Sequence, residues 1–288
     1  LSIVTGRSGA DMSLTTVAGS LGTIRFGTLA DPDELNVLVP AHLKSAENLL
    51  VRTDGDVFGG NAEAEQLLRM EGRNLYFGRV QSLQGDVSLL GSGDYMDGHG
   101  DITGLLVEAF RDIGIIASGN LVMPELKAGR DLTVGVRGDL NVQGEAEAGR
   151  DLFFDVGRNV DLRGAKAGRD VTVNAGGAIN FDDRVEAGGN ILLNAKGGDI
   201  TVGGPMTSTG QYEGNPISGK ISLTATGDIT TTLVSTASLV DGNIDVQGQN
   251  LSLGNLSSSE NIDLLARGSI QVGDSGSAGH QNWFSDGD

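Results

Sequence analysis

The 288-residue chain has no cysteine, only five prolines and 4% aromatic residues. The lack of cysteine excludes a disulfide framework, and the low proline count excludes a collagen-like chain. The longest apolar stretches, such as residues 105–110, are much shorter than the 18 or more apolar residues of a membrane-spanning helix. We therefore expect no membrane insertion.

Positive charge is also scarce, because 20 Lys and Arg residues face 38 Asp and Glu residues, for a formal net charge of −18. Binding to a nucleic-acid backbone relies on clustered basic residues, so nucleic acid is not an expected partner. An acidic chain fits a solvated extracellular surface or sites for divalent cations. Because the chain begins at Leu1, we expect a piece of a longer protein with its targeting segment upstream.

Glycine, in contrast, is abundant, with 46 residues in the chain. The average protein contains about 7% glycine, which is less than half of this share. Hydrophobic residues make up 38% of the chain and occur in short bursts of Leu, Ile and Val. This composition favours many short strands joined by tight turns, and so an all-β fold.

The bursts recur in pairs through the second half of the chain. The residues that precede the first burst of each pair are spaced by 20, 19, 20, 30, 23 and 18 positions: Asp131, Asp151, Asp170, Asn190, Lys220, Asn243 and Asn261. The second bursts follow at offsets of 8, 8, 8, 9, 8, 7 and 8, after Asp139, Asn159, Ala178, Asp199, Asp228, Asn250 and Ser269. Seven copies with a nearly constant offset indicate an internal repeat.

Each burst follows the pattern Gly-x-(Asp/Asn)-apolar-x-apolar, as in GRDLTV and GGNILL. Alternation with a period of two predicts strands with one buried face, so Leu132 and Val134 should point inward and Thr133 outward. The preceding Gly and Asp or Asn are expected to supply a positive φ and local hydrogen bonds at a sharp corner.

A unit of about 20 residues with two or three short strands and no helix is typical of one coil of a solenoid. Stacked coils would pair their strands in parallel at about 4.8 Å, and chirality favours a right-handed path. The predicted fold is therefore an all-β, right-handed parallel β-helix. A closed antiparallel barrel or a propeller is the alternative, and the short constant offset argues against it.

The motifs AGRDLTV, AGRDLFF, AGRDVTV and AGGNILL, with the intervening RGDLNV and GGDITV, resemble filamentous haemagglutinin repeats. Such repeats occur in large exoproteins of bacterial two-partner secretion systems, including adhesins and contact-dependent inhibition proteins. The resemblance is strong over residues 117–273 and weaker over 1–116, and residues 274–288 form a tail or the start of a next coil. It implies a β-helical rod, export by an outer-membrane two-partner transporter, a secreted or cell-surface location and a role in adhesion.

Two departures from the repeat lie in the first half of the chain. Residues 61–74, NAEAEQLLRMEGRN, contain good helix formers and could form a short helix or an irregular coil. Asp94, Asp97 and Asp101 in GSGDYMDGHGD are candidate calcium ligands, because calcium takes several carboxylate oxygens from a tight turn. Their spacing does not match an EF-hand, and a solvated acidic turn explains them as well.

Two further departures lie in the second half. The insertion PMTSTGQYEGNP, residues 205–216, lengthens one coil and carries Tyr212, Glu213 and Asn215 as candidate ligand-binding residues. A loop that leaves a rigid solenoid is a common binding surface, although a neutral insertion is equally compatible with the sequence. The tail carries the only tryptophan, Trp283, a further ligand-binding candidate.

The arginines and aspartates of the repeat also invite comparison with a catalytic site. They align in successive copies as Arg130, Arg150 and Arg169, and as Asp131, Asp151 and Asp170. Catalytic residues would break a repeat, whereas these residues form it, so we expect a ladder of ion pairs and hydrogen bonds at the corner. No nucleophile, metalloprotease or phosphate-binding motif accompanies them.

These observations lead us to expect a rod segment of a secreted or cell-surface bacterial adhesin that attaches to cells, matrix polysaccharide or a cell-surface receptor. We expect no enzymatic activity and no cofactor, with calcium left open. One alternative is the stalk or receptor-binding segment of a contact-dependent growth inhibition protein. A β-helical polysaccharide-degrading enzyme is the other.

Overall fold

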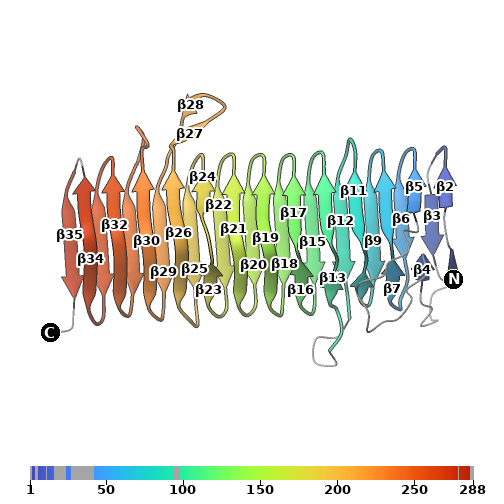
Figure 1. Cartoon of the computed structure of the whole chain (residues 1–288), viewed down its shortest axis with the longest axis horizontal. Coiled ribbons are helices and arrows are strands. Elements are labelled where there is room, and N and C mark those ends of the chain that lie inside the picture. The colour runs from blue at the N-terminus through green and yellow to red at the C-terminus, as the bar shows by residue number, and fades with distance from the viewer. Residues whose placement is uncertain are drawn as a thin grey trace. The chain divides into compact units, whose positions relative to one another are not determined.

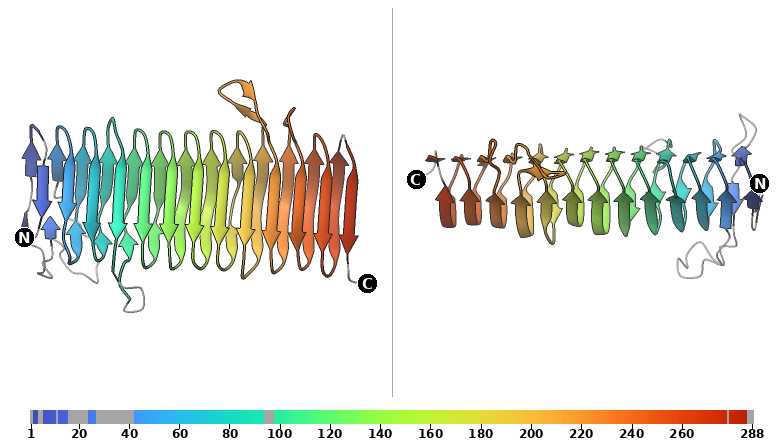
Figure 2. Two further views of the ribbon diagram at one scale, coloured as in Figure 1. Left: turned by 180° about the vertical axis from the view of Figure 1, so that it is seen from behind. Right: turned by 90° about the horizontal axis from the view of Figure 1, so that it is seen from above.

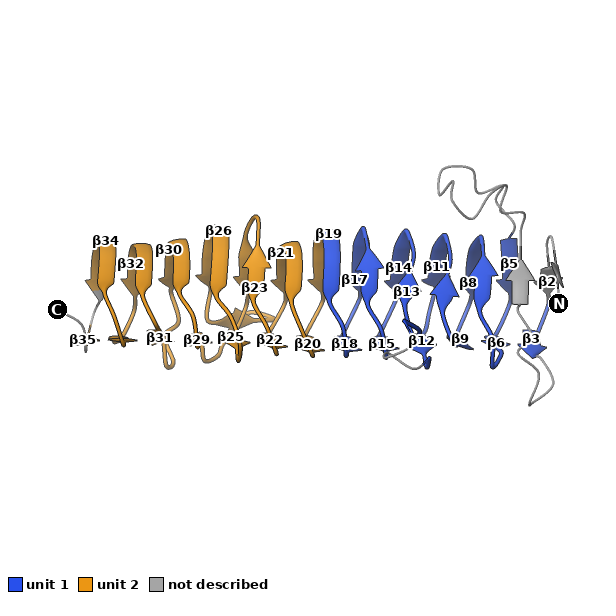
Figure 3. Cartoon of the chain, turned by 90° about the horizontal axis from the view of Figure 1, so that it is seen from below, with its two compact units in different colours: residues 1–143 blue, residues 144–288 orange. Residues whose placement is uncertain are grey.

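The computed structural model describes residues 2–3, 6–10, 12–15, 24–26, 42–93, 98–277 and 279–285. All regular structure in these residues is β, and the chain divides into two compact units, Leu1–Gln143 and Gly144–Asp288, coloured separately in Figure 3. Among the same residues there is no helix with the length and apolar character needed to cross a membrane.

Unit 1 is a stack of coils, each of which contributes to two parallel sheets (Figure 1). Its first sheet contains β3 (Met12–Thr15), β6 (Leu49–Arg52), β9 (Leu68–Gly72), β12 (Val87–Gly91), β15 (Ile113–Ala117) and β18 (Leu132–Val136). One row of its second sheet contains β1 (Ser2–Ile3), β4 (Ile24–Phe26), β7 (Val57–Gly59), β10 (Leu75–Tyr76), β13 (Ile102–Thr103), β16 (Leu121–Met123) and the start of β19 (Leu140–Ala148). The other row contains β2 (Gly6–Ser8), β5 (His42–Ser45), β8 (Asn61–Ala64), β11 (Arg79–Ser82), β14 (Leu106–Ala109) and β17 (Glu125–Ala128).

Unit 2 is built in the same way (Figure 2). Its first sheet contains β20 (Leu152–Val156), β22 (Val171–Ala175), β25 (Ile191–Ala195), β29 (Ile221–Ala225), β31 (Ile244–Gly248), β33 (Ile262–Ala266) and β35 (Gln281–Ser285). Its second sheet contains β21 (Val160–Ala167), β23 (Ile179–Phe181), β24 (Val185–Ala187), β26 (Ile200–Ser208), β30 (Ile229–Thr236), β32 (Leu251–Ser258) and β34 (Ile270–Ser277). A separate hairpin is formed by β27 (Gln211–Tyr212) and β28 (Asn215–Pro216).

The structure confirms the predicted parallel β-helix with coils of about 20 residues. Each of the predicted bursts begins a strand one residue after its marker; for example, β18 begins after Asp131 and β19 after Asp139. Strands of successive coils pair in parallel, as β22 does with β25 from Val171↔Ile191 to Ala175↔Ala195.

Stacked aliphatic side chains fill the interior of each unit. Leu132 and Val134 are fully buried and Thr133 is exposed, as the alternation predicts. Val171 and Val173 of unit 2 are buried in the same way. Since a single coil has too little apolar surface to enclose, burial depends on the coils above and below it.

Segment 61–74, for which a helix was one prediction, is part of the regular stack. Residues 61–64 form β8 and residues 68–72 form β9, both paired with neighbouring coils. Ala62, Ala64, Leu68 and Met70 are buried. Of the two alternatives, the helix is wrong and the segment is a coil of the stack, because burial in the coil outweighs the helix propensity of Ala, Glu and Leu.

The corner glycines correct a second expectation. In the described residues, regular-coil corners such as Gly129 and Gly168 do not have a positive φ. A Cβ on Gly129 would lie 2.0 Å from the carbonyl oxygen of Phe110 in the preceding coil, and one on Gly168 would lie 2.0 Å from that of Gly149. Glycine is needed here because two coils come too close for any side chain.

The corner Asp and Asn residues also bond between coils rather than within a turn. Asn120 Oδ1 accepts the Asp139 N–H at 2.9 Å, and Asp170 Oδ1 accepts the Asn190 N–H at 2.7 Å. Asn261 Oδ1 accepts the His280 N–H at 2.9 Å. Each corner side chain thus supplies the acceptor for a backbone amide of the next coil.

We expect Val134→Asp to unfold the protein or to lower its free energy of unfolding by more than about 4 kcal/mol, because the charge would be buried without a partner. Thr133→Lys, on the exposed face of the same strand, should change it by less than about 0.5 kcal/mol. Thermal melting followed by circular dichroism measures both. A Val134→Asp variant that melts like the parent would contradict the assignment of the core.

The glycine argument gives a matched pair of variants. Gly129→Ala should lower the free energy of unfolding by about 1–3 kcal/mol, because the added methyl group meets backbone of the preceding coil. Gly135→Ala should be neutral or stabilising by up to about 1 kcal/mol, since nothing lies within 4 Å of its Cβ position. Equal effects in urea unfolding would show that close approach does not select the corner glycine.

Candidate functional site

The Arg and Asp residues of the repeat form the predicted ion-pair ladder within each unit. In unit 1, Arg130 Nε donates to Asp112 Oδ1 at 2.7 Å. In unit 2, Arg169 Nε donates to Asp151 Oδ1 at 2.7 Å. Asp112 Oδ1 also accepts the Asp131 N–H at 3.2 Å, so the carboxylate is engaged in holding the corner.

Ion pairs with arginine lower the pKa values of two aspartate side chains at the corners. The Arg130 hydrogen bond holds the pKa of Asp112 below its ordinary value, against a smaller opposing effect of burial. Asp56 has its pKa lowered in the same way by Arg73, whose Nε and Nη2 lie 2.9 and 2.8 Å from its two carboxylate oxygens. Both carboxylates stay ionised at neutral pH and serve the scaffold.

The candidate calcium turn is only partly within the described residues. Asp94 and Asp97 lie outside them, and Asp101 belongs to the corner stack, where its Oδ1 accepts the Asn120 N–H at 2.6 Å. Within the described ranges no group of three or more acidic or histidine side chains is placed to hold a metal ion.

The insertion that carries Tyr212, Glu213 and Asn215 forms the hairpin β27–β28, which leaves the coil ends in Figure 1. Tyr212 pairs antiparallel with Asn215. Between them, Glu213 has φ 49° and Gly214 has φ 78°. Two successive positive φ values are typical of a type I′ turn, which favours a tight two-residue hairpin.

A second excursion, residues 237–241, follows β30 in the next coil and was not singled out from the sequence. Ser218, which follows the hairpin segment, forms a parallel bridge with Val240 of this excursion. Asp241 has φ 53°, the second positive φ of a non-glycine residue in the described chain after Glu213. The only early signal was the spacing of 23 between Lys220 and Asn243.

Ser238 joins the hairpin segment and the excursion 237–241 at their base. Its side chain is buried, and its Oγ lies 2.7 Å from the carbonyl oxygen of Ile217 and accepts the Val240 N–H at 3.1 Å. A Cβ on Gly210, which has φ 64°, would lie 2.3 Å from Ser238 Cα. We call residues 210–217 with 237–241 the projection, because they form one hydrogen-bonded structure.

Below the projection, the buried column changes from alanine to hydroxyl residues. Ala167 pairs with Ala187, Ala187 with Ser208, and Ser208 with Thr236. Ser208 Oγ donates to the Gly189 carbonyl oxygen at 2.6 Å, and Thr236 Oγ1 donates to that of Gly219 at 2.7 Å. These hydroxyls pair with backbone carbonyls at the corners next to the projection.

The outer part of the projection is apolar and acidic. Leu239 is 81% exposed and Val240 is 49% exposed, and the side chains of Asp241, which follows them, and of Glu213 at the hairpin turn are also exposed. Tyr212 instead turns toward the scaffold, with its Cε2 3.4 Å from the Cβ position of Gly168. Its pKa is raised, first by burial and then by Glu213, which fits a packing role.

Trp283 lies in the tail strand β35, which pairs in register with β33. Trp283 stands opposite the buried Leu264, on the interior side of the stack, and Phe284 stands opposite Leu265 on the outer side. Trp283 is 46% exposed and lies in a different strand and a different sheet from the projection residues Glu213 and Asn215.

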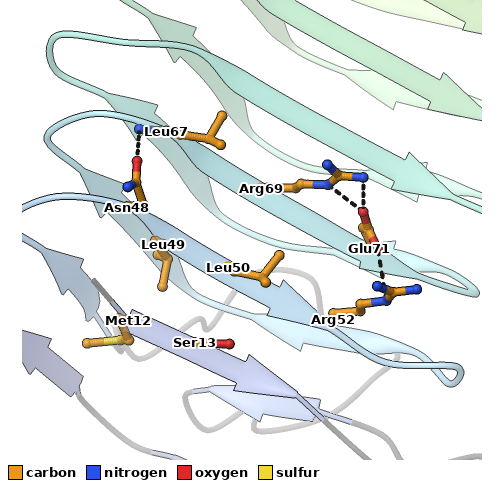
Figure 4. Close-up of a pocket in the computed structure, with 9 residues that line it drawn as sticks. All are labelled: Met12, Ser13, Asn48, Leu49, Leu50, Arg52, Leu67, Arg69 and Glu71. Carbon is orange, nitrogen blue, oxygen red and sulfur yellow. Dashed lines mark hydrogen bonds and ion pairs between the residues drawn. The ribbon is translucent and has the colours of Figure 1, made fainter. Parts of the chain in front are cut away.

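A groove in unit 1 was also missed by the sequence reasoning. It has a volume of about 430 Å³ and lies on the outer side of the first sheet, over β3, β6 and β9 (Figure 4). Leu50 and Leu67 line it together with Arg52, Arg69 and Glu71. No repeat motif marks these residues, because outward positions vary from coil to coil.

Comparisons with protein-family models, with curated proteins and with solved structures found no match to this chain. The resemblance to filamentous haemagglutinin repeats therefore remains a prediction from the motifs.

We expect Asp112→Asn to lower the melting temperature at neutral pH and to lose this effect in acid. Folding lowers the pKa of Asp112, so its contribution to stability is complete above the unfolded pKa of about 3.9 and disappears as pH falls through the folded pKa. Melting curves at pH 7, 4 and 2 test this. Asp155→Asn, an exposed residue of β20, is the control, and an Asp112→Asn effect that is constant with pH would exclude the charge as its cause.

Proposed function

We propose that this chain is a segment of a secreted or surface-attached bacterial adhesin, in which β-helical coils hold a projection for attachment to a cell surface. The proposal joins the resemblance of the repeat motifs to haemagglutinin-type exoproteins with one structural observation. That observation is the projection itself, with Leu239 81% exposed.

The regular coils support a role as a scaffold. Their corner carboxylates and amides bind backbone amides and arginines of neighbouring coils, as Asp112 and Asp170 do. Residues engaged in this way hold geometry and have few free contacts for a ligand. The variable outward positions and the excursions are then the places where binding can evolve without loss of the fold.

The projection has the properties of a protein contact. Exposed aliphatic side chains that are rimmed by polar residues typically mark protein interaction sites. The buried base at Ser238 and the tight hairpin turn hold these side chains in place before binding, which lowers the entropic cost of association. The exposed Asp241, next to Val240 in the chain, fits a receptor whose apolar pocket has a basic residue at its edge.

Binding of the fluorescently labelled chain to animal and bacterial cells, followed by flow cytometry, tests the proposal. We expect saturable binding, and we expect Leu239→Asp with Val240→Asp to weaken it at least tenfold, because a central apolar contact is typically worth about 1–3 kcal/mol. A melting curve of the double variant should match the parent, since both side chains are exposed.

The matched control is Leu105→Asp with Ile116→Asp, which adds the same charge at exposed residues of unit 1. This control should bind like the parent. Equal loss with both double variants would show a general effect of charge and would contradict the role of the projection. Absence of binding to any cell, or release of oligosaccharides from a polysaccharide panel, would contradict the adhesin proposal as a whole.

A further inference from the structure

The groove of unit 1 holds an unequal set of charges. Glu71 is 8% exposed, and it is held by Arg69 through Nε and Nη2 and by Arg52, whose Nε lies 3.1 Å from Glu71 Oε2. Among the residues that the structure describes, these three are the charged ones that line the groove, and there two cations face one anion. The chain as a whole carries −18, which makes this a position of unusual sign.

Both arginines also have N–H groups that do not bind Glu71. The side chains of Arg52 and Arg69 are 64% and 50% exposed. In the part of the chain that the structure describes, the Nη atoms of Arg52 donate no hydrogen bond. Because Glu71 fixes both guanidinium groups from below, their remaining N–H groups are oriented before a ligand arrives (Figure 4).

Neutral surface completes the groove. In the register of β6 and β9, Arg69 stands opposite Leu50 and Glu71 opposite Arg52, so Leu50 is the aliphatic side chain among these four positions. Leu67 is 38% exposed at one side, and the hydroxyl of Ser13 lies on the neighbouring strand β3. The volume of about 430 Å³ is within the range of small-ligand sites.

We propose that this groove binds a carboxylate-bearing sugar residue of an acidic polysaccharide. Arg52 and Arg69 would donate to the carboxylate, since paired N–H groups of arginine match two carboxylate oxygens. The aliphatic C–H face of the sugar ring would lie on Leu50 and Leu67, and Ser13 offers a hydroxyl partner. The site lies in unit 1 and does not depend on the proposed role of the projection.

An acidic peptide is the competing occupant, and the geometry favours the sugar. The groove lies on the face of the sheet, and β6 and β9, which carry both arginines and Glu71, are each paired on both sides, so neither strand offers an open edge to an extended peptide. Its apolar lining consists of Leu50, Leu67, Met12 and the buried Leu49, beside two exposed arginines, and this combination suits a sugar ring that carries a carboxylate.

The test uses the whole chain with a tetramer of galacturonic acid and the methyl ester of the same tetramer, measured by isothermal titration calorimetry at low salt. We expect the acid to bind and the ester to bind at least tenfold more weakly, because only the carboxylate differs. Rising salt should weaken the binding of the acid, since the site is exposed and ion screening reaches it. Sialyllactose in a separate titration distinguishes a sialic-acid source from a uronic-acid source of the carboxylate.

Arg52→Ala should weaken binding of the acid about tenfold while Arg69 still holds Glu71. Arg52→Ala with Arg69→Ala and Glu71→Gln should abolish it without leaving a buried charge unpaired. The matched control is Arg79→Ala on the second sheet, where Arg79 pairs with Glu108, and it should bind like the parent.

Several results would overturn the proposal. Equal affinity for the tetramer and its ester would show that the carboxylate is not recognised. Unchanged affinity in the Arg52→Ala and triple variants, or no heat with either carboxylate sugar at millimolar concentration, would exclude the groove. Polyglutamate that binds as tightly as the tetramer and is lost in the same variants would assign the groove to acidic peptides instead.

Discussion

The stacking of one coil on the next is the constraint on which the other features of each unit depend. Strands of neighbouring coils lie about 4.8 Å apart, so every corner brings backbone amides into a place where only the preceding coil can provide an acceptor. Asn120 Oδ1 meets this need for Asp139, and Asn261 Oδ1 meets it for His280. The same closeness excludes a Cβ at Gly129. Glycine and Asp or Asn therefore recur for two separate reasons, one steric and one a matter of hydrogen bonding.

Because glycine and Asp or Asn have separate roles at the corner, one coil can be longer than its neighbours while the pairing of the stack is kept. The residue at the corner position after the hairpin is Lys220, whose N–H is still accepted by Asn190 Oδ1 at 3.0 Å, although 30 positions separate the two residues. The chain between them is free to extend, provided that its own polar groups are paired. Buried Ser208 and Thr236, in place of alanine, bind the carbonyls of Gly189 and Gly219 at these corners. Ser45 and Ser82 of unit 1 make the same kind of bond to backbone carbonyls, so these hydroxyls are compatible with an insertion but not specific to it.

The sequence was sufficient for the features that repeat and insufficient for those that do not. Strand starts such as Leu132 followed from the Asp marker, because the same contact is made in each coil. The second excursion left only a spacing of 23 before Asn243, which does not show that Ser238 ties it to the hairpin. The register of Trp283, opposite the buried Leu264, could have been predicted from alternation alone, since His280 occupies the corner position three residues before it.

The residues of the groove could not be predicted from the repeat. Stacking fixes the inward positions of β6 and β9, but it sets no residue type at the outward ones, so Arg52 and Glu71 carry no periodic signal. Their meaning comes from the register, which puts them side by side although 19 positions separate them in sequence. Because Glu71 is largely buried, the second arginine is more than charge balance requires. An excess cation that is held rigidly on an acidic protein is better explained by an anionic ligand than by stability.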